Sequence, residues 1–185
     1  MVIIGITGTL GAGKGTIVDY LIKEKDFVHF SVRKFITKEI VKRGLPVNRD
    51  SMTLVGNDLR KNNSPSYITD QLYIEAKKLG RNCIIESVRT TGEVEQLRKN
   101  EDFYLFAIDA DQRVRYERIT QRGSSTDNVS FDTFASNEQR EMSSTDPNKQ
   151  NLKACIDQAD FVFNNNGTIE DLNAQVENVL QKILK

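Results

Sequence analysis

The sequence predicts an α/β fold in which helices cover both faces of a parallel sheet of five strands. Short apolar runs rich in β-branched and aromatic residues alternate with longer stretches that have helical spacing. This alternation is typical of strand–helix–strand units, whose strands are parallel. The runs are continuous rather than alternating with polar residues, as expected for strands buried on both faces. A chain of 185 residues is long enough for one domain with a sizeable core.

Each element follows from a local pattern. The expected strands are residues 2–7, 27–30, 83–86, 103–108 and 161–163. The expected helices are residues 14–24, 32–43, 66–79, 92–99, 112–121 and 168–184. Two stretches rich in polar and turn residues interrupt the pattern, at 44–65 and 122–150. Phe131 and Phe134 give the second stretch apolar side chains to bury, so we expect a helical flap there and not a linker.

Composition argues against several classes of protein. Lys and Arg number 26, as do Asp and Glu, so the basic excess of nucleic-acid-binding proteins is missing. Cys83 and Cys155 stand in apolar surroundings without a CxxC pair, which favours two reduced core thiols over a zinc site. The apolar N-terminus is too short for a signal peptide or a membrane span. We expect a cytoplasmic monomer or dimer with no membrane partner.

The main chemical signal is the segment IIGITGTLGAGKGT near the N-terminus. Glycines let backbone N–H groups turn toward a phosphate, a lysine adds positive charge, and the following helix presents its positive end. An expected strand before the segment and an expected helix after it are the context that this motif needs. The segment therefore predicts a P-loop that binds the phosphates of ATP through Gly8, Gly11, Ala12, Gly13, Lys14, Gly15 and Thr16.

The GKGT ending resembles adenylate kinase and other nucleoside monophosphate kinases. Gly15 stands where the common P-loop has Ser or Thr, and Thr16 follows it. The resemblance extends over nearly the whole chain. It implies a three-layer P-loop NTPase sandwich forming a single kinase domain, with an acceptor-binding insertion at about 31–66 and a lid at about 122–150. It also implies ATP and Mg²⁺ as cofactors, with the Thr16 hydroxyl near a phosphate or the magnesium ion.

The stretch CIIESVR ends an expected strand with Glu86 and places Arg89 three residues later. The matching DGFPR of adenylate kinases carries an acidic group near magnesium and an arginine on the acceptor phosphate, so the resemblance implies these roles for Glu86 and Arg89. The stretch is also similar to an EGxR branch related to dephospho-CoA kinase and adenylate kinase. Ligands bind at the carboxyl ends of strands in open α/β sheets, which suits Glu86. Asp109 is the rival carboxylate for the metal. The alternative for Glu86 is a helix cap or a salt bridge, and the alternative for Arg89 is a surface ion pair.

Further acceptor residues are expected after the second strand. Related kinases carry an STGDxxR segment there; Ser31 of HFSVRKFI matches its serine, and Arg33 is the nearby guanidinium. The acidic residue is missing, which leaves AMP as the acceptor in doubt. Arg60, in VGNDLRKN, is a second guanidinium for an acceptor phosphate. A solvated helix face is the alternative for both arginines.

Arg118 and Arg122 lie four residues apart and so share one face of a helix. The resemblance implies that they form a lid pair over the adenine and the transferring phosphate, with a solvated basic helix as the alternative. Arg140, in NEQREMSS, is a further candidate donor to the acceptor. No cysteine lies in the lid, so it lacks the zinc cluster of some bacterial adenylate kinases.

The remaining three positions concern the adenine base and the single histidine. Asn165 and Gly167, in a loop after the last strand, are candidates for backbone contact with adenine, with a plain turn as the alternative. His29 has no Ser, Cys or acid pattern beside it and is interpreted as structural.

The predicted function is a kinase that moves the γ-phosphate of ATP to a nucleoside or deoxynucleoside monophosphate. Lys14, Arg89, Arg118 and Arg122 carry this reaction by positioning and charge stabilisation. One alternative is a dephospho-CoA kinase-like activity, in which Glu86 or Asp109 acts as a base toward a hydroxyl. The other is an ATP-binding switch that hydrolyses ATP slowly and acts through a protein or RNA partner. Acceptor-dependent turnover separates the kinases from the switch.

Overall fold

The predicted α/β fold is confirmed. A computed structural model describes residues 1–123 and 129–184. Five strands form one sheet in the order β2-β3-β1-β4-β5, and each is parallel to its neighbours. The strands are β1 (Ile3–Gly8), β2 (Val28–Ser31), β3 (Cys83–Glu86), β4 (Phe103–Asp109) and β5 (Phe161–Asn164).

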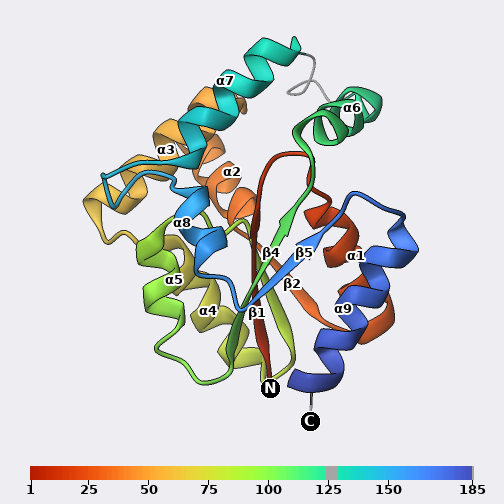
Figure 1. Cartoon of the computed structure of the whole chain (residues 1–185). Coiled ribbons are helices and arrows are strands. Elements are labelled where there is room, and N and C mark those ends of the chain that lie inside the picture. Colours follow the sequence, from red (N-terminus) through yellow and green to blue (C-terminus); the bar gives the residue numbers. More distant parts are fainter. Residues whose placement is uncertain (124–128, 185) are drawn as a thin grey trace.

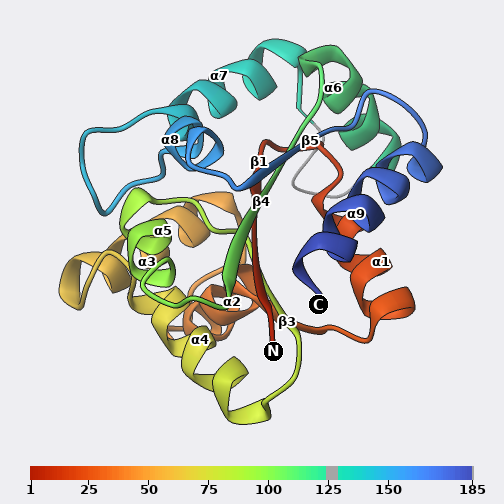
Figure 2. The ribbon, with the colours of Figure 1, turned by 60° about the horizontal axis from the view of Figure 1, so that its bottom comes forward.

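Helices connect the strands and pack on both faces of the sheet (Figure 1). They are α1 (Lys14–Lys25), α2 (Val32–Lys42), α3 (Arg49–Asn62), α4 (Tyr67–Leu79), α5 (Thr91–Leu97), α6 (Gln112–Arg122), α7 (Phe131–Met142), α8 (Leu152–Asp157) and α9 (Ile169–Ile183). Figures 1 and 2 place α1 and α9 together on one side of the sheet and α2, α4 and α5 on the other. In Figure 1, α6 and α7 lie above the carboxyl ends of the strands.

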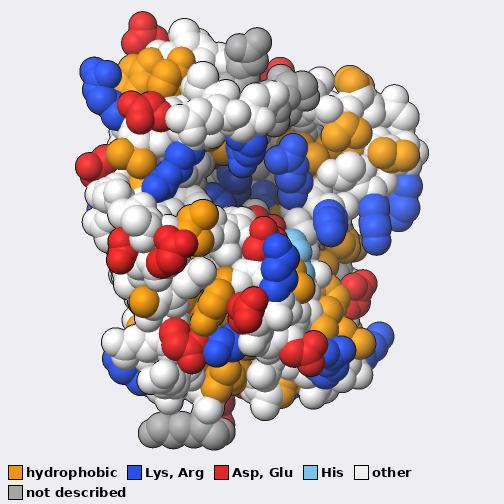
Figure 3. Space-filling model, turned by 90° about the vertical axis from the view of Figure 1, so that its right-hand side faces the viewer, with side chains coloured by type: hydrophobic (Ala, Val, Ile, Leu, Met, Phe, Trp, Pro, Cys, Tyr) orange, Lys and Arg blue, Asp and Glu red, His pale blue; other side chains and the backbone are white. Residues whose placement is uncertain are grey.

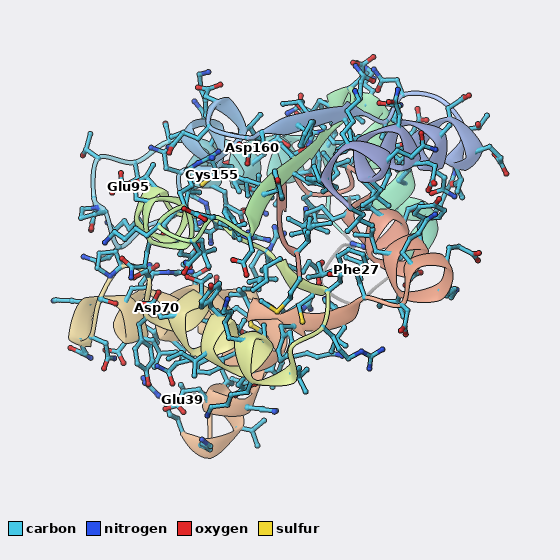
Figure 4. The ribbon with its side chains drawn as sticks, turned by 90° about the horizontal axis from the view of Figure 1, so that it is seen from below. Phe27, Glu39, Asp70, Glu95, Cys155 and Asp160 are labelled. Atoms are coloured by element: carbon cyan, nitrogen blue, oxygen red, sulfur yellow. The ribbon has the colours of Figure 1, made fainter. Side chains whose placement is uncertain are left out.

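Two apolar clusters separate the three layers. One cluster packs the sheet against α2, α3, α4 and α5, and it includes Cys155 of α8. The other packs the sheet against α1 and α9, and it includes Phe27. Figure 4 labels both residues. Cys83 and Cys155 are both free and buried, and burial raises the pKa of the Cys155 thiol to about 12.

The two polar stretches contain helices. Helix α3 lies within the stretch 44–65, where the sequence pattern gave no helix. Its first turn is capped by Asn48, which accepts from the Ser51 N–H at 2.8 Å. Val55 and Leu59, four residues apart, are buried in the cluster that contains α2. Packing against α2 thus stabilises a helix whose polar sequence alone does not indicate one.

The expected flap contains helix α7. Phe134 is buried, and its ring lies 5.6 Å from that of Tyr116 on α6 and 6.3 Å from that of Phe131. The Tyr116 hydroxyl also donates to the Val129 carbonyl at 3.1 Å. These contacts join α7 to α6. Residues 124–128 of the expected flap lie outside the described residues. No helix in the described part of the chain is long and apolar enough to cross a membrane.

Candidate functional site

The P-loop runs from the end of β1 to the first turn of α1. Gly8, Gly11 and Gly13 have φ values of 136°, 80° and 100°. Residues with a side chain rarely adopt these positive φ values. The glycines therefore allow the backbone to fold around a phosphate. Gly13 is the N-cap of α1 and has no side chain to satisfy the helix, which leaves the first N–H groups open to an anion.

Lys14 lies over this loop. Its ammonium donates to the Gly8 carbonyl at 2.8 Å and to the Thr9 carbonyl at 2.7 Å. Burial lowers the pKa of Lys14 to about 7, with help from the positive charge of Arg89, while Glu86 and Glu141 act against this decrease. An anion beside Lys14 favours its charged form, so the site is electrostatically prepared for phosphate.

Asn165 contacts the backbone of the P-loop. Its side-chain amide donates to the Ala12 carbonyl at 2.8 Å, and the residue is 6% exposed. A Cβ on Gly13 would lie 2.2 Å from the Asn165 Nδ2 atom, so only glycine fits there. Gly167 is exposed beside Asp171, and neither Asn165 nor Gly167 lines the site cavity. Their expected contact with adenine stays a prediction.

A cavity of about 450 Å³ extends from the P-loop to α2 and α3. Seven of its lining side chains are Lys or Arg and two are Glu, so the cavity favours anions. Figure 3 shows a hollow with Lys and Arg side chains gathered around it. Of the residues singled out from the sequence, those that line the cavity are Gly11, Gly13, Lys14, Gly15, Thr16, Arg33, Arg60, Glu86, Arg89, Arg118 and Arg122.

Glu86 is the carboxylate at the end of β3, and it faces the cavity. Its Oε2 atom lies 3.0 Å from Nε2 of His29, two positions before the end of the neighbouring strand β2. The hydrogen bond to His29 lowers the pKa of Glu86, and the charges of Lys14 and Arg89 add to this effect against burial. The sequence does not indicate this contact, because His29 and Glu86 are far apart along the chain. They meet only because β2 lies beside β3 in the sheet.

Asp109, the other carboxylate considered for the metal, forms hydrogen bonds outside the cavity. Its Oδ1 atom accepts from the Thr9 hydroxyl at 2.8 Å and from the Ala110 N–H at 2.9 Å. Asp109 therefore ties the P-loop to the end of β4, and it does not line the cavity.

Arg89 enters the cavity from the turn between β3 and α5. Its Nη1 atom donates to Glu141 of α7 at 3.0 Å and to the side-chain carbonyl of Gln150 at 2.7 Å. Both partners come from the expected lid region. The sequence pattern singled out neither Glu141 nor Gln150, because an isolated Glu or Gln in a polar stretch carries no signal of its own.

The expected acceptor residues have different surroundings. Ser31 is the N-cap of α2 and accepts from the Lys34 N–H at 3.3 Å, and it does not line the cavity. Arg60 is 3% exposed and held by Glu93, so it is not on a solvated helix face. Arg33 is exposed and lines the cavity, and its contact with an acceptor stays a prediction. Arg49, the first residue of α3, also lines the cavity and was not singled out from the sequence.

The arginines of α6 divide into two roles. Arg118 and Arg122 line the cavity, and the buried Nη1 atom of Arg118 has no hydrogen-bond partner among the described residues. A buried guanidinium N–H without a partner fits a site for an absent anion. Arg115 is buried and donates to the Leu10 carbonyl at 3.2 Å and to Glu138 of α7, which links the P-loop to the flap.

Arg140 lies outside this arrangement. It is exposed on α7, its side chain donates to Asn137 beside it, and it does not line the cavity. The structure therefore does not bring Arg140 to the other site residues.

Known proteins share the fold and the sequence pattern. A family model described as an AAA domain, AAA_18, matches residues 4–144. UPF0200 protein MJ1399 of Methanocaldococcus jannaschii is 30% identical over 187 residues, covering 100% of this chain and 91% of that protein.

Solved structures agree at the level of the fold. TT1252 from Thermus thermophilus has a TM-score of 0.63 at 18% identity and is matched over 98% of this chain and 97% of its own. Shikimate kinase from Bacteroides thetaiotaomicron has a TM-score of 0.54 at 12% identity. The match covers 100% of this chain and 99% of the shikimate kinase chain. The P-loop geometry and these matches agree: the chain has the fold of P-loop kinases and belongs to the UPF0200 and AAA-domain families.

Proposed function

We propose that this chain is an ATP-dependent kinase that transfers the γ-phosphate to a nucleoside monophosphate. The observation that carries the proposal is the single cavity that joins the P-loop to the α2–α3 region, with cationic side chains at both ends. Lys14 stands at one end, and Arg33 and Arg49 stand at the other. A protein that only hydrolyses ATP has no need for a second cationic subsite beyond its P-loop.

The P-loop end suits MgATP. Lys14 and the loop N–H groups would hold the β- and γ-phosphates. The Thr16 hydroxyl and the Glu86 carboxylate line the same cavity, and oxygen ligands of this kind suit Mg²⁺. Glu86 is preferred to Asp109, because Glu86 lines the cavity and Asp109 does not. A bound magnesium ion would neutralise charge on the phosphates during transfer.

The other end suits an acceptor with an apolar face and an anionic group. Ile36, Val47 and Met52 supply apolar lining, while Arg33 and Arg89 supply guanidinium groups. A purine or pyrimidine ring and a phosphate have this combination of properties. Arginine binds phosphate in a fork geometry, which favours a phosphate group over a neutral substituent.

Transfer then depends on position and charge. Arg89 orients the acceptor phosphate toward the γ-phosphate held by Lys14. Arg118 and Arg122 approach the phosphates from α6 and stabilise the charge that spreads over the transferring group. No strong base is required, because an acceptor phosphate is already ionised at neutral pH.

A hydroxyl acceptor, as in a dephospho-CoA kinase-like reaction, is the second candidate. The observation in its favour is the His29–Glu86 pair at the edge of the cavity. A hydroxyl must lose a proton during transfer, and a histidine-supported carboxylate is a possible base. The lowered pKa of Glu86 makes it a weak base, which is why this candidate ranks second.

Acceptor-dependent turnover tests the proposal. The purified protein with MgATP is assayed against the nucleoside and deoxynucleoside monophosphates and dephospho-CoA, and ADP, free phosphate and phosphorylated acceptor are all measured. A kinase makes ADP and phosphorylated acceptor in equal amounts. ADP accompanied only by free phosphate, whatever acceptor is present, would identify a slow ATPase switch and refute the kinase.

The Arg89→Ala variant tests which subsite Arg89 serves. We expect a raised acceptor KM or a lowered kcat, with MgATP affinity nearly unchanged. Arg81→Ala is the matched control, because Arg81 is exposed and pairs with Asp26 at the opposite end of β3. Loss of MgATP affinity with retained acceptor affinity would contradict the assignment of Arg89 to the acceptor.

A further inference from the structure

Glu141 forms an ion pair with Arg89, whose guanidinium the proposed function assigns to the acceptor phosphate. Its Oε2 atom lies 3.0 Å from Nη1 of Arg89, and the side chains of Glu141 and Arg89 are 18% and 26% exposed. The same Nη1 atom donates to Gln150 at 2.7 Å. In the free protein, the cation expected to receive an acceptor phosphate is therefore already bound by the end of α7.

The stability of α7 does not explain an acidic residue at this position. Glu141 is the penultimate residue of the helix, where the negative end of the helix dipole disfavours a carboxylate. The side chain does not turn outward to water but lines the cavity. Its charge also acts on Lys14, whose pKa Glu141 raises and Arg89 lowers. Glu141 thus lies where the two phosphate subsites meet.

A phosphate that binds the guanidinium of Arg89 meets the carboxylate of Glu141, which already accepts from Nη1. A phosphomonoester carries a charge of about −1.5 to −2 at pH 7, and a second anion against Glu141 would be repelled. Because of this repulsion, the phosphate binds Arg89 most tightly when the carboxylate moves away. A doubly charged phosphate offers more charge and more acceptor oxygens than one carboxylate, so it can displace Glu141 where a weaker anion cannot.

We propose that Glu141 is a specificity-determining residue that competes with the acceptor phosphate for Arg89 and thereby excludes weakly charged acceptors. This inference rests on the proposed function, since it takes Arg89 as the acceptor's arginine. The acceptor class is then a phosphate dianion, not a carboxylate or a neutral hydroxyl compound.

Binding of inorganic phosphate to the Glu141→Gln variant tests the proposal. The P-loop is first saturated with a non-hydrolysable MgATP analogue, so that added phosphate reports on the second subsite. Calorimetry should give a Kd at least about fivefold lower than that of the unchanged protein, since a competing charge has been removed. Glu95→Gln is the matched control: Glu95 is exposed on α5 and does not line the cavity.

Two further measurements exclude a general effect on the fold. In an Arg89→Ala background, Glu141→Gln should lower the phosphate Kd by a clearly smaller factor, because only the charge repulsion remains and the competition for the guanidinium is gone. In the ligand-free protein, Glu141→Gln should increase hydrogen exchange of the last turns of α7, which lose their tether to Arg89.

The outcomes separate this inference from the proposed function. Phosphate that binds Glu141→Gln no more tightly, or more weakly, would overturn the competition. An increase in phosphate affinity by the same factor without Arg89 would overturn it as well. Tighter phosphate binding in a protein that phosphorylates no acceptor would support the competition and refute only the kinase.

Discussion

Arg60 and Glu93 form a buried ion pair that joins α3 to the first turn of α5. The Nε and Nη2 atoms of Arg60 lie 3.1 and 2.9 Å from Oε1 of Glu93, and the two residues are 3% and 0% exposed. The other oxygen of Glu93 accepts from the backbone N–H groups of Arg89 at 2.7 Å and Thr90 at 3.1 Å. The pair therefore fixes the turn that carries Arg89, and α3 is attached to it.

Removal of Arg60 should destabilise the protein strongly. Arg60→Met leaves the Glu93 charge buried without its partner, and breaking a buried pair in this way costs about 3–5 kcal/mol. Urea denaturation measures the change in the free energy of unfolding. The control is Arg81→Met, which breaks an exposed pair and should cost less than about 1 kcal/mol. Similar values for the two variants would mean that water reaches the Arg60–Glu93 pair.

Loss of Lys14 should affect nucleotide binding and not folding. Lys14 lies over the P-loop and belongs to neither apolar core cluster, so Lys14→Ala should remain folded. MgATP affinity or turnover should fall at least about tenfold, which corresponds to 1.4 kcal/mol. Titration with MgATP measures the affinity, and Lys23→Ala, an exposed position on the same helix, is the control. Unchanged affinity in Lys14→Ala would refute the phosphate-binding role of the loop.

Nucleotide binding should take up a proton above neutral pH. The Lys14 pKa is about 7 in the free protein, so the amine is largely neutral at pH 8. A bound phosphate raises this pKa, and Lys14 then gains a proton. The uptake should approach one proton near pH 8 to 9 and vanish below about pH 6, where Lys14 is already charged.

Calorimetry of MgATP binding in buffers with different ionisation enthalpies measures this proton. Lys14→Arg is the control, because a guanidinium stays charged at every pH used. It should bind MgATP without uptake near pH 8 to 9. Equal uptake in both proteins would assign the proton to another group.

The flap should become more protected when both substrates bind. The buried Nη1 atom of Arg118 has no hydrogen-bond partner among the described residues, so Arg118 gains contacts when phosphates bind, which gives the ligand a preference for a closed state. Closure would also exclude water, which otherwise competes for the phosphate. Hydrogen exchange over 122–150, with and without a bisubstrate mimic, is the measurement, and α9 serves as the internal control. Equal exchange in both states would mean that this segment does not move on binding, and it would favour the ATP-binding switch over the kinase.

The strands, the P-loop and most helices could be predicted because each depends on neighbouring residues. Gly8, Gly13 and Lys14 lie within one short segment between an apolar run and an amphipathic stretch, so local chemistry is sufficient. Helix α3 escaped prediction, because Val55 and Leu59 become a helical face only when α2 covers them. The short helix α8 was missed as well, since six residues carry little periodicity.

By itself, the sequence determined the α/β fold, the anion-binding loop and the identity of the charged residues around it. Only the tertiary structure decided how these charges are paired. His29 meets Glu86 across 57 positions, Arg60 meets Glu93 across 33, and Arg89 meets Glu141 across 52. Such partners come together only when the sheet and its helices pack. A guanidinium that reads as a ligand-binding group in the sequence can therefore be a buried structural pair, as Arg60 is, or one held by the flap, as Arg89 is.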